Sequence, residues 1–312
     1  MTTGMLWTAL LIDIVAGDPQ WFPHPVRFIG LAVSKLEGLV RRWARSERSL
    51  KAGGVFLTLA AVAGTFFAAW LALALCSFIS PILHWIAAVI LAYTTLAVKA
   101  LYMESWIVIQ AVRSDDLEEA RRLLSRIVSR DTSNLDRDQI LTAVIETIAE
   151  NISDGIIAPL FYLWLGGVPL AMAFKAASTI DSMLGYKDDP FKDIGWFGAR
   201  CDDVFNFVPA RVTALLLIAS AAILRLDYRS AWRIWRRDAR KHASPNAGHP
   251  ESAMAGALNV RLGGPNSYFG QMKKKPYLGD PGLPASVERA RQAEKLLFMS
   301  TAIMALITGV LL

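Results

Sequence analysis

The sequence predicts an all-α, polytopic membrane protein with about four to five transmembrane helices and additional re-entrant or interfacial helices. Two observations on composition support this class: 54% of the 312 residues are hydrophobic, and only 19% are charged. A soluble domain is usually nearer half apolar and a quarter charged. The third observation is that the apolar residues gather in long stretches. Alternating runs of β-branched residues are few, so strands are not expected.

Six apolar stretches are candidates for membrane helices, because a bilayer core needs about 20 apolar residues in helical form. The stretches are Met5–Val15, Val55–Ile79, Ile82–Val98, Ile156–Phe174, Val208–Leu224 and Leu296–Leu312. Val55–Ile79 satisfies the length and carries no charge. Met5–Val15 is too short and contains Asp13. Since it has neither a basic leader nor a clear cleavage site, we expect it to remain in the mature chain rather than to be a signal peptide.

The basic residues indicate the orientation of the chain. The net charge of +6 does not form a basic stripe on a soluble fold, so a nucleic-acid partner is not expected. Lys and Arg instead gather in polar segments beside the apolar stretches, and such segments face the cytoplasm in membrane proteins. We expect one helical domain over residues 1–312 in the inner cell membrane, with cytoplasmic segments at about 99–155, 176–207 and 225–295.

A long polar helix is predicted in front of the fourth apolar stretch. Ser133 and Asp136 have the spacing of a capping box, which places the start of this helix near Asn134. The Asn151–Gly155 segment, which combines polar residues with glycine, is expected to end it. Beyond the apolar stretch, a loop dense in polar motifs is expected over Lys175–Asn206.

The polar segments carry the candidate functional residues. Asp18, His24 and Arg27 belong to a proline-rich turn that brings them close together, although a helix exit held by prolines would explain the same residues. Glu146 and Glu150 fall on one face of the polar helix, nearly opposite its apolar residues. A solvated face is the usual explanation for such a pair. These glutamates, however, lead into a hydrophobic segment, where carboxylates are costly unless they bind a partner.

The densest cluster contains Asp202, Asp203 and Asn206, with Arg200 before them and the predicted helix start Pro209–Arg211 after them. Carboxylate and amide oxygens suit Mg²⁺, which bridges to substrate phosphates through one or two carboxylates. Arginines suit phosphate oxygens. Chance charges on a surface loop would not require two aspartates beside an interfacial helix. These residues therefore predict a magnesium-phosphate site.

A fourth polar segment covers Ser244–Glu251. Pro250 suits the first turn of a short helix, which Gly263–Gly264 is expected to end. The glycines allow the backbone to approach a ligand, although this signal is weak by itself. His242 and His249 are seven residues apart, and such a pair is more often found in turns or packing than as metal ligands.

Taken in order, these motifs closely resemble the CobD/CbiB family of cobalamin biosynthesis, the adenosylcobinamide-phosphate synthases. The matching stretches are Gly17–Pro19, Pro23–Arg27, Ser129–Ser133, Ile145–Glu146, Ala149–Asn151, Ser153–Gly155, Ala158–Phe161, Asp181–Met183, Gly185–Lys187, Ala199–Arg200, Asp202–Asp203, Pro209–Arg211, Ser244–Gly248 and Arg261–Gly264. The resemblance covers about residues 10–280 and is specific, because many uncommon motifs occur in one order. Ser178 departs from the pattern, which has Asn before Thr179, so no ligand contact is carried over to that position.

The resemblance implies a ligase that depends on ATP and Mg²⁺. It would join aminopropanol phosphate, or a related amino alcohol, to the free propionate of adenosylcobyric acid. A carboxylate is a poor electrophile and must be activated, as an acyl phosphate or by another route. The candidate catalytic residues are Glu146, Glu150, Asp181 and Lys187. The candidate cofactor-binding residues are Arg27, Asn151, Asp154, Arg200, Arg211, Ser244, Asn246 and Arg261. The candidate metal ligands are Asp202, Asp203 and Asn206.

The hypothesis gives these residues distinct tasks. The metal ligands hold Mg-ATP, while Arg200, Arg211 and Lys187 contact phosphates. Glu146 or Glu150 either binds a second Mg²⁺ or deprotonates the incoming ammonium. The implied partners are adenosylcobyric acid, the amino-alcohol phosphate and the lipid bilayer. A homo-oligomer and an association with later nucleotide-loop assembly enzymes both stay open.

Two other functions stay open as well. One is a Mg-dependent membrane transferase acting on a lipid-linked phosphate, although the Asp spacing does not match the known transferase patterns. The other is a non-enzymatic membrane sensor or transporter. For the ligase, cytoplasmic ATP requires all polar clusters on one side of the membrane. We therefore predict that Ile156–Phe174 is re-entrant or packed inside the protein, with its helix broken by Pro159, Gly166, Gly167 and Pro169.

Overall fold

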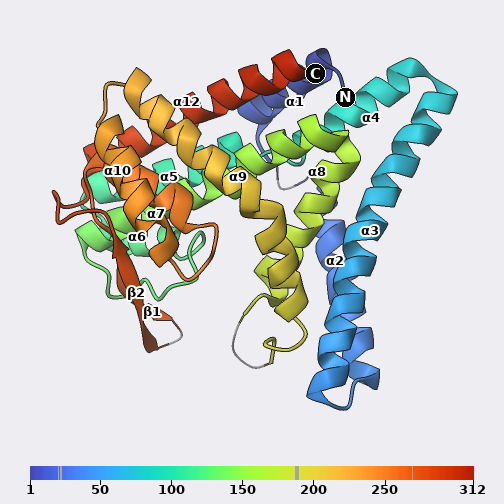
Figure 1. Cartoon of the computed structure of the whole chain (residues 1–312), viewed down its shortest axis with the longest axis horizontal. Coiled ribbons are helices and arrows are strands. Elements are labelled where there is room, and N and C mark those ends of the chain that lie inside the picture. Colours follow the sequence, from blue (N-terminus) through green and yellow to red (C-terminus); the bar gives the residue numbers. More distant parts are fainter. Residues whose placement is uncertain (20, 22, 187–189, 269) are drawn as a thin grey trace. The chain divides into compact units, whose positions relative to one another are not determined.

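Helices dominate the protein, and the predicted all-α class is confirmed (Figure 1). The computed structural model describes residues 1–312 except 20, 22, 187–189 and 269. The chain forms two compact units, each built from several segments. Unit 1 comprises Met1–Ala97, Ala158–Asn206 and Ala305–Leu312. Unit 2 comprises Val98–Ile157 and Phe207–Met304.

Several helical stretches are long and apolar enough to cross a membrane. Among the described residues there are five: Glu47–Ile79, Pro81–Arg113, Arg137–Leu184, Trp196–Ile223 and Val287–Leu311. This number agrees with the predicted four to five. Thr3–Ala16 is apolar but shorter, as expected for a stretch too short to span a bilayer. By length and composition the chain is a multi-pass membrane protein.

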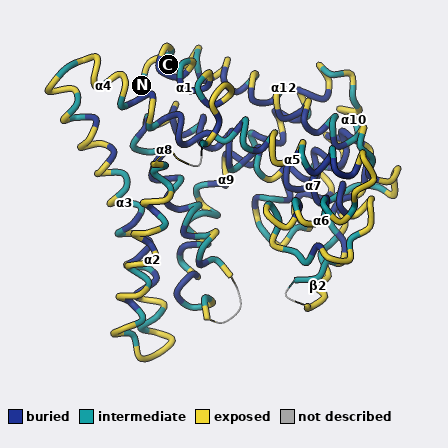
Figure 2. The backbone as a smooth tube through the Cα atoms, turned by 180° about the vertical axis from the view of Figure 1, so that it is seen from behind, coloured by how far each residue is buried: buried dark blue, intermediate teal, exposed yellow. Residues whose placement is uncertain are grey.

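Unit 1 is a group of apolar helices around α3. Its elements are α1 (Thr3–Ala16), α2 (Pro25–Trp43), α3 (Glu47–Ile79), α4 (Pro81–Tyr93), α8 (Ala158–Leu184), the first part of α9 (Trp196–Ile223) and the end of α12 (Val287–Leu311). Helix α3 packs against α2, α4 and α8. Many other residues of α3 are exposed (Figure 2). The large ones among them are apolar, which suits contact with lipid.

Unit 2 is more enclosed. Its elements are α5 (Val98–Arg113), α6 (Leu117–Leu124), α7 (Arg137–Ile152), η1 (Ser153–Ile157), the rest of α9, α10 (Tyr228–Asp238), η2 (Ala239–Lys241), α11 (Gly248–Leu258), β1 (Leu262–Tyr268), β2 (Gln271–Leu278) and most of α12. Helix α11 packs against α10 and α7, and every one of its residues is buried. A helix buried on all sides must satisfy its polar side chains internally.

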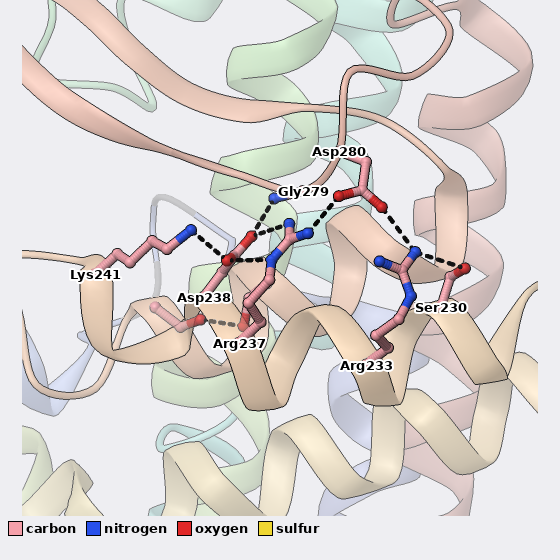
Figure 3. Close-up of polar contacts among 9 residues, drawn as sticks. Ser230, Arg233, Arg237, Asp238, Lys241, Gly279 and Asp280 are labelled. Atoms are coloured by element: carbon pink, nitrogen blue, oxygen red, sulfur yellow. Dashed lines mark hydrogen bonds and ion pairs between the residues drawn. The ribbon is translucent and has the colours of Figure 1, made fainter.

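A charged network fixes α10 to the segment that follows β2 (Figure 3). The fully buried Asp238 carboxylate accepts hydrogen bonds from Arg237 and from the Gly279 N–H, and it pairs with Lys241 at 2.6 Å. Asp280 accepts from Arg237 in turn. Burial alone would favour neutral Asp238, but these donors hold the pKa of its carboxyl well below the usual value. The base of the β-hairpin is thereby anchored.

The start and the end of the polar helix differ from the prediction. Helix α7 begins at Arg137 rather than near Asn134, because Asp136 and Gln139 form the capping box. The Asn151 segment does not end the helix. The Asn151 amide donates within the helix to Thr147 O at 2.9 Å, and a π-helical turn over Ser153–Ile157 leads directly into α8. Such turns are frequent at functional sites.

The expected loop over Lys175–Asn206 is largely helical, because α8 continues to Leu184 and α9 begins at Trp196. Pro209 lies inside α9 rather than at a helix start. Proline lacks the N–H that would bond to the carbonyl four residues earlier, at Phe205. The Tyr162 hydroxyl donates to that carbonyl at 2.6 Å instead. The helix can therefore pass through Pro209.

The prediction of a broken helix in Ile156–Phe174 is confirmed. Most of this stretch is buried in the protein, and its helical backbone is interrupted at Gly166 and Gly167. Gly167 has a φ of 67°, a conformation that side chains with a Cβ rarely adopt. The break falls at the glycines, and Pro169 follows inside the next helical turn.

The absence of strands was predicted wrongly. β1 and β2 form an antiparallel hairpin, with Leu262 opposite Leu278 and Tyr268 opposite Gln271. A register shift between Gly263 and Pro265 marks a bulge. The hairpin lacks the β-branched alternation that signals strands, and positive φ values at its glycines make the bulge possible. The glycines therefore do not end α11.

Helix α11 ends at Leu258 because Asn259 adopts a left-handed conformation, with a φ of 52°. Asparagine tolerates this conformation better than most residues. Pro250 lies in the first turn of α11, as predicted.

Candidate functional site

A charged cavity of about 230 Å³ lies within unit 2. Its walls come from the segment before α7, from α7 and α11, and from the hairpin. The lining residues are Ile127, Val128, Ser129, Arg130, Glu146, Thr147, Glu150, Asn151, His242, Glu251, Gly263, Tyr268 and Lys275. Three of the predicted site residues, Glu146, Glu150 and Asn151, are thus brought together. The structure adds cations and a further carboxylate that the sequence reasoning did not select.

Within this cavity the Glu146 carboxylate is held in place by protein groups. Its side chain is 7% exposed, and that of its ion-pair partner Arg130 is 10% exposed. One oxygen of Glu146 accepts from Arg130, and the other accepts from the Gly263 N–H at 2.6 Å. Arg130 also donates to Asn266 Oδ1 at 3.0 Å. Both oxygens of Glu146 therefore bind protein groups, which suits a positioning residue.

Asp131 ties the segment before α7 to the hairpin. Its carboxylate accepts from the Ser267 hydroxyl and from the Gly270 N–H, and its own N–H donates to Ser267 O at 2.9 Å. These contacts hold the neighbouring Arg130 against α7. The hairpin is thus a structural wall of the cavity.

Glu251 adds a second buried carboxyl to the cavity. It lies on α11 and is 7% exposed. Burial, together with the negative charges of Glu146 and Glu150, raises the pKa of the Glu251 carboxyl well above its ordinary value. The positive charges of Lys275 and Arg130 oppose this rise. A carboxyl of this kind keeps its proton to a higher pH than an ordinary glutamate does.

Lys275 is the second cation of the cavity. Burial disfavours its ammonium form, but a hydrogen bond to Tyr268 and the charges of Tyr268 and Glu251 raise the pKa of Lys275 above its ordinary value. Its Nζ also lies 5.1 Å from the centroid of the Tyr268 ring. Lys275 is therefore held as a cation against an aromatic wall.

A second group of predicted residues in unit 2 surrounds the start of α11. Arg211 donates to Asn246 Oδ1 at 3.3 Å, so two predicted cofactor-binding residues meet. The Ser244 hydroxyl accepts from the Asn246 N–H at 3.2 Å and thereby shapes the turn. Nearby His249 accepts from the Trp235 indole, and burial with the charges of two arginines lowers the pKa of His249 to about 4. His249 is therefore neutral and packed against Trp235.

The acidic cluster of unit 1 lies on two helices. Asp181 on α8 and Asp203 on α9 are close enough for their charges to interact. Asp202 Oδ2 accepts from Asn206 Nδ2 at 3.0 Å, one helical turn away. Asn206 is buried, and no hydrogen bond to its Oδ1 is found among the described residues. An amide oxygen placed in this way suits a cation, because buried acceptors usually have a partner.

The described residues contain no group of three or more His, Cys, Asp or Glu side chains arranged for a metal ion. Magnesium often uses only one or two carboxylates and completes its shell with water and phosphate oxygens. The cluster around Asp203 therefore fits that ion chemically. The assignment of Asp202, Asp203 and Asn206 as metal ligands stays a prediction.

Arg27 lies at another cavity of unit 1, of about 320 Å³, which Asp18, His24 and Lys175 also line. His24 Nε2 lies 3.5 Å from Asp18 Oδ1, which confirms that the proline-rich turn brings these side chains together. His24 Nδ1 accepts from the Val26 N–H and so caps α2. The turn thus has a structural role at the start of α2. This role is compatible with the predicted ligand contact of Arg27.

The other predicted residues are more scattered. Asp154 lies in the π-helical turn and is half-buried, Arg200 is exposed on α9, and Arg261 is exposed with its Cζ 3.5 Å from the centroid of the Tyr277 ring. Lys187 lies outside the described residues, so its role stays a prediction.

The cavity residues that were not selected from the sequence include Arg130, Glu251, Tyr268 and Lys275. Arg130 and Glu251 did lie in polar motifs, next to Asp131 and to Pro250 respectively. Tyr268 and Lys275 carried no usable signal, because the hairpin that places them was not predicted. Their common property is a charged or polar side chain facing an enclosed space.

Fold and site together define a polytopic helical membrane protein with a charged cavity in one unit and a carboxylate cluster in the other. Residues 6–297 match the CobD/Cbib protein family. The chain is 45% identical over 304 residues to cobalamin biosynthesis protein CobD of Geobacter metallireducens, covering 97% of this chain and 95% of the relative. It is 46% identical to CobD of Citrobacter koseri, with coverages of 96% and 95%.

Cobalamin biosynthesis protein CbiB of Salmonella arizonae is also 46% identical, over 93% of this chain and 91% of the relative. The chain therefore belongs to the CobD/CbiB family of cobalamin biosynthesis proteins. No solved structure matches it.

Proposed function

We propose that this protein forms the amide bond between an amino-alcohol phosphate and the free propionate of adenosylcobyric acid, with consumption of ATP. In this reaction the propionate carboxylate takes a phosphoryl group from ATP and ADP leaves. The amine then attacks the acyl carbon, phosphate leaves, and the nitrogen loses a proton. The protein must therefore bind anionic groups, stabilise phosphoryl transfer and accept a proton from an ammonium.

The observation that carries this proposal is the cavity of unit 2, which is lined by both carboxyl groups and cations. Glu251 and Glu150 line it beside the fixed Glu146–Arg130 pair. A general base works best when its pKa lies near the operating pH, and burial raises the pKa of Glu251 in that direction. We infer that Glu150 or Glu251 accepts the ammonium proton, whereas Glu146 positions Arg130 and the hairpin.

The acidic cluster of unit 1 is proposed to hold Mg-ATP. Asp203, Asp202 and Asn206 would supply oxygen ligands, and Asp181 on α8 is close enough for its charge to interact with that of Asp203. When bound, the ion neutralises the developing charge on the transferring phosphoryl group. Arg200 is exposed on the same helix, one turn before Asp203, and would contact phosphate oxygens.

We further propose that both clusters serve the cytoplasmic side of the inner membrane, because ATP is supplied there. Single cysteines introduced into a background without Cys76 and Cys201 can be labelled from each side. Label entering only from outside the cell, at a cysteine in place of Lys241, would contradict this orientation.

The test of the reaction uses the purified full chain in detergent, with adenosylcobyric acid, ATP, Mg²⁺ and aminopropanol phosphate. We expect a corrinoid product whose mass exceeds that of adenosylcobyric acid by the mass of aminopropanol phosphate minus one water. One ADP and one phosphate should be released for each amide formed. Asp203→Asn is expected to lower turnover by at least about 100-fold, because it removes a charge at the metal. Asp115→Asn is a matched control, since the Asp115 side chain is 83% exposed.

Normal turnover by the Asp203 variant would contradict the magnesium assignment. Absence of both corrinoid-dependent ADP release and a new corrinoid would contradict the ligase itself. Transfer of a group to a lipid-linked phosphate without ATP would instead indicate the membrane-transferase alternative.

A further inference from the structure

The cavity of unit 2 is small. Its volume is about 230 Å³. Of the three substrates in the proposed reaction, the three-carbon amino-alcohol phosphate is the smallest, and it suits this cavity better than ATP or a corrinoid.

The charges of the cavity are mixed. Three carboxyl groups line it, those of Glu146, Glu150 and Glu251, against the two permanent cations Arg130 and Lys275. Glu146 and Arg130 are joined in one buried ion pair and balance each other. The remaining carboxyl groups come from α7 and α11, and Lys275 comes from β2. A ligand that carries both a positive and a negative group would match these walls.

The positions of Glu251 and Lys275 are fixed by the fold. Glu251 belongs to α11, of which every residue is buried. Lys275 lies on β2, its ammonium against the Tyr268 ring of the paired strand. Lys274 is exposed and does not line the cavity, whereas Lys275 is half-buried and does. Lys275 is thus distinguished from the other lysines of the strand by its position.

We propose that this cavity binds a small zwitterion, with the ammonium group recognised by Glu251 and Glu150 and the phosphate group by Lys275. The inference rests on the proposed function, since it assigns the amine substrate of that reaction to one cavity. It makes Glu251 and Lys275 the residues that select an amino-alcohol phosphate over molecules bearing only one of its charges. Selection works in this way because a ligand that lacks one charged group loses the interaction of that group with the cavity residues.

The inference is tested by equilibrium binding to the purified full chain in detergent, without ATP or corrinoid. Three probes are compared: aminopropanol phosphate, aminopropanol, and propyl phosphate. The wild type is expected to bind aminopropanol phosphate at least about tenfold more tightly than either truncated probe, the usual effect of losing one charged hydrogen bond.

The variants should separate the two ends of the ligand. Glu251→Gln is expected to weaken the two amine probes by about tenfold or more and to leave propyl phosphate unchanged. Lys275→Met is expected to weaken the two phosphate probes and to leave aminopropanol unchanged. Lys274→Met, which changes an exposed lysine of the same strand outside the cavity lining, is the control and should change none of the three affinities. A variant that fails to fold would lose all probes equally, so this pattern distinguishes recognition from stability.

Turnover with adenosylcobyric acid is measured on the same preparations. If the wild type forms product but binds no probe, or if neither Glu251→Gln nor Lys275→Met changes any affinity, the amine site is elsewhere and the inference is overturned. The ligase proposal stands in that case. If the probes bind with the expected pattern but no corrinoid product forms, the zwitterion site stands and the proposed reaction fails.

Discussion

Replacing Arg130 by methionine would leave the Glu146 carboxylate without its charged partner inside unit 2. The two side chains are only 10% and 7% exposed, so water cannot substitute fully for the lost guanidinium. Removing one member of a buried ion pair costs about 3–5 kcal/mol, because the remaining charge stays desolvated. For a protein of this size, each kcal/mol lowers the melting temperature by about 2–4 °C. Arg130→Met should therefore lower the apparent melting temperature by roughly 6–20 °C.

A double-mutant cycle tests the cause of this loss. Glu146→Gln keeps an oxygen for the Gly263 N–H, which now donates to Glu146 at 2.6 Å, but it removes the charge. In the double variant Arg130→Met/Glu146→Gln no buried charge is left alone, so most of the stability should return. The assay is thermal unfolding of the full chain in detergent, followed by circular dichroism.

Arg122→Met is the matched control, because the Arg122–Glu119 ion pair is largely exposed, with side-chain exposures of 56% and 37%. It should leave the melting temperature unchanged. The reasoning would be refuted if Arg130→Met were as harmless as the control. It would also be refuted if the double variant lost as much stability as the two single variants together.

Three further predictions concern groups whose environment is unusual. Burial and the neighbouring glutamates raise the pKa of Glu251, so wild-type stability falls as pH rises from the ordinary carboxyl pKa of about 4.3 through the raised value. Glu251→Gln removes this loss, and its melting temperature should exceed that of the wild type by a margin that grows as the pH rises above about 4.3. Tyr162→Phe removes the donor to Phe205 O and should cost about 1–3 kcal/mol in thermal unfolding, whereas an unchanged melting temperature would show that this carbonyl needs no partner. Asp238→Asn weakens the anchor of the hairpin base. We expect faster proteolysis of β1 and β2 and a loss of at least about 2 kcal/mol in the free energy of unfolding. Cleavage rates equal to those of the wild type would contradict this role.

The membrane helices could be predicted because the property that defines them is local. Val55–Ile79 is uncharged and longer than a bilayer core requires, so no tertiary information was needed to recognise α3. The break at Gly166 and Gly167 was also local, since glycine and proline act on the backbone directly. The course of α9 through Pro209 was not local. It depends on Tyr162, far away in the sequence, which bonds to the carbonyl that proline leaves without a donor.

The candidate site was predictable in part for the same reason. Glu146 and Glu150 could be identified because two carboxylates beside an apolar segment are unusual at any single place in a sequence. The environment of Glu146 could not be predicted, since its partners Arg130 and Gly263 lie 16 and 117 residues away. Sequence spacing shows that Glu146 and Glu150 share a helix face. It does not show that both oxygens of Glu146 bind groups distant in the sequence.

The hairpin links the error in the fold to the residues missed in the site. It supplies three cavity residues, Gly263, Tyr268 and Lys275, and none of them could be placed while the segment was expected to be free of strands. Its contacts with Asp131 are also what hold the preceding Arg130 against α7. A cavity lined by carboxyl groups is unfavourable unless its charges are balanced by groups in fixed positions. The two strands provide that balance, and the charged cavity of this helical protein therefore depends on its one sheet among the described residues.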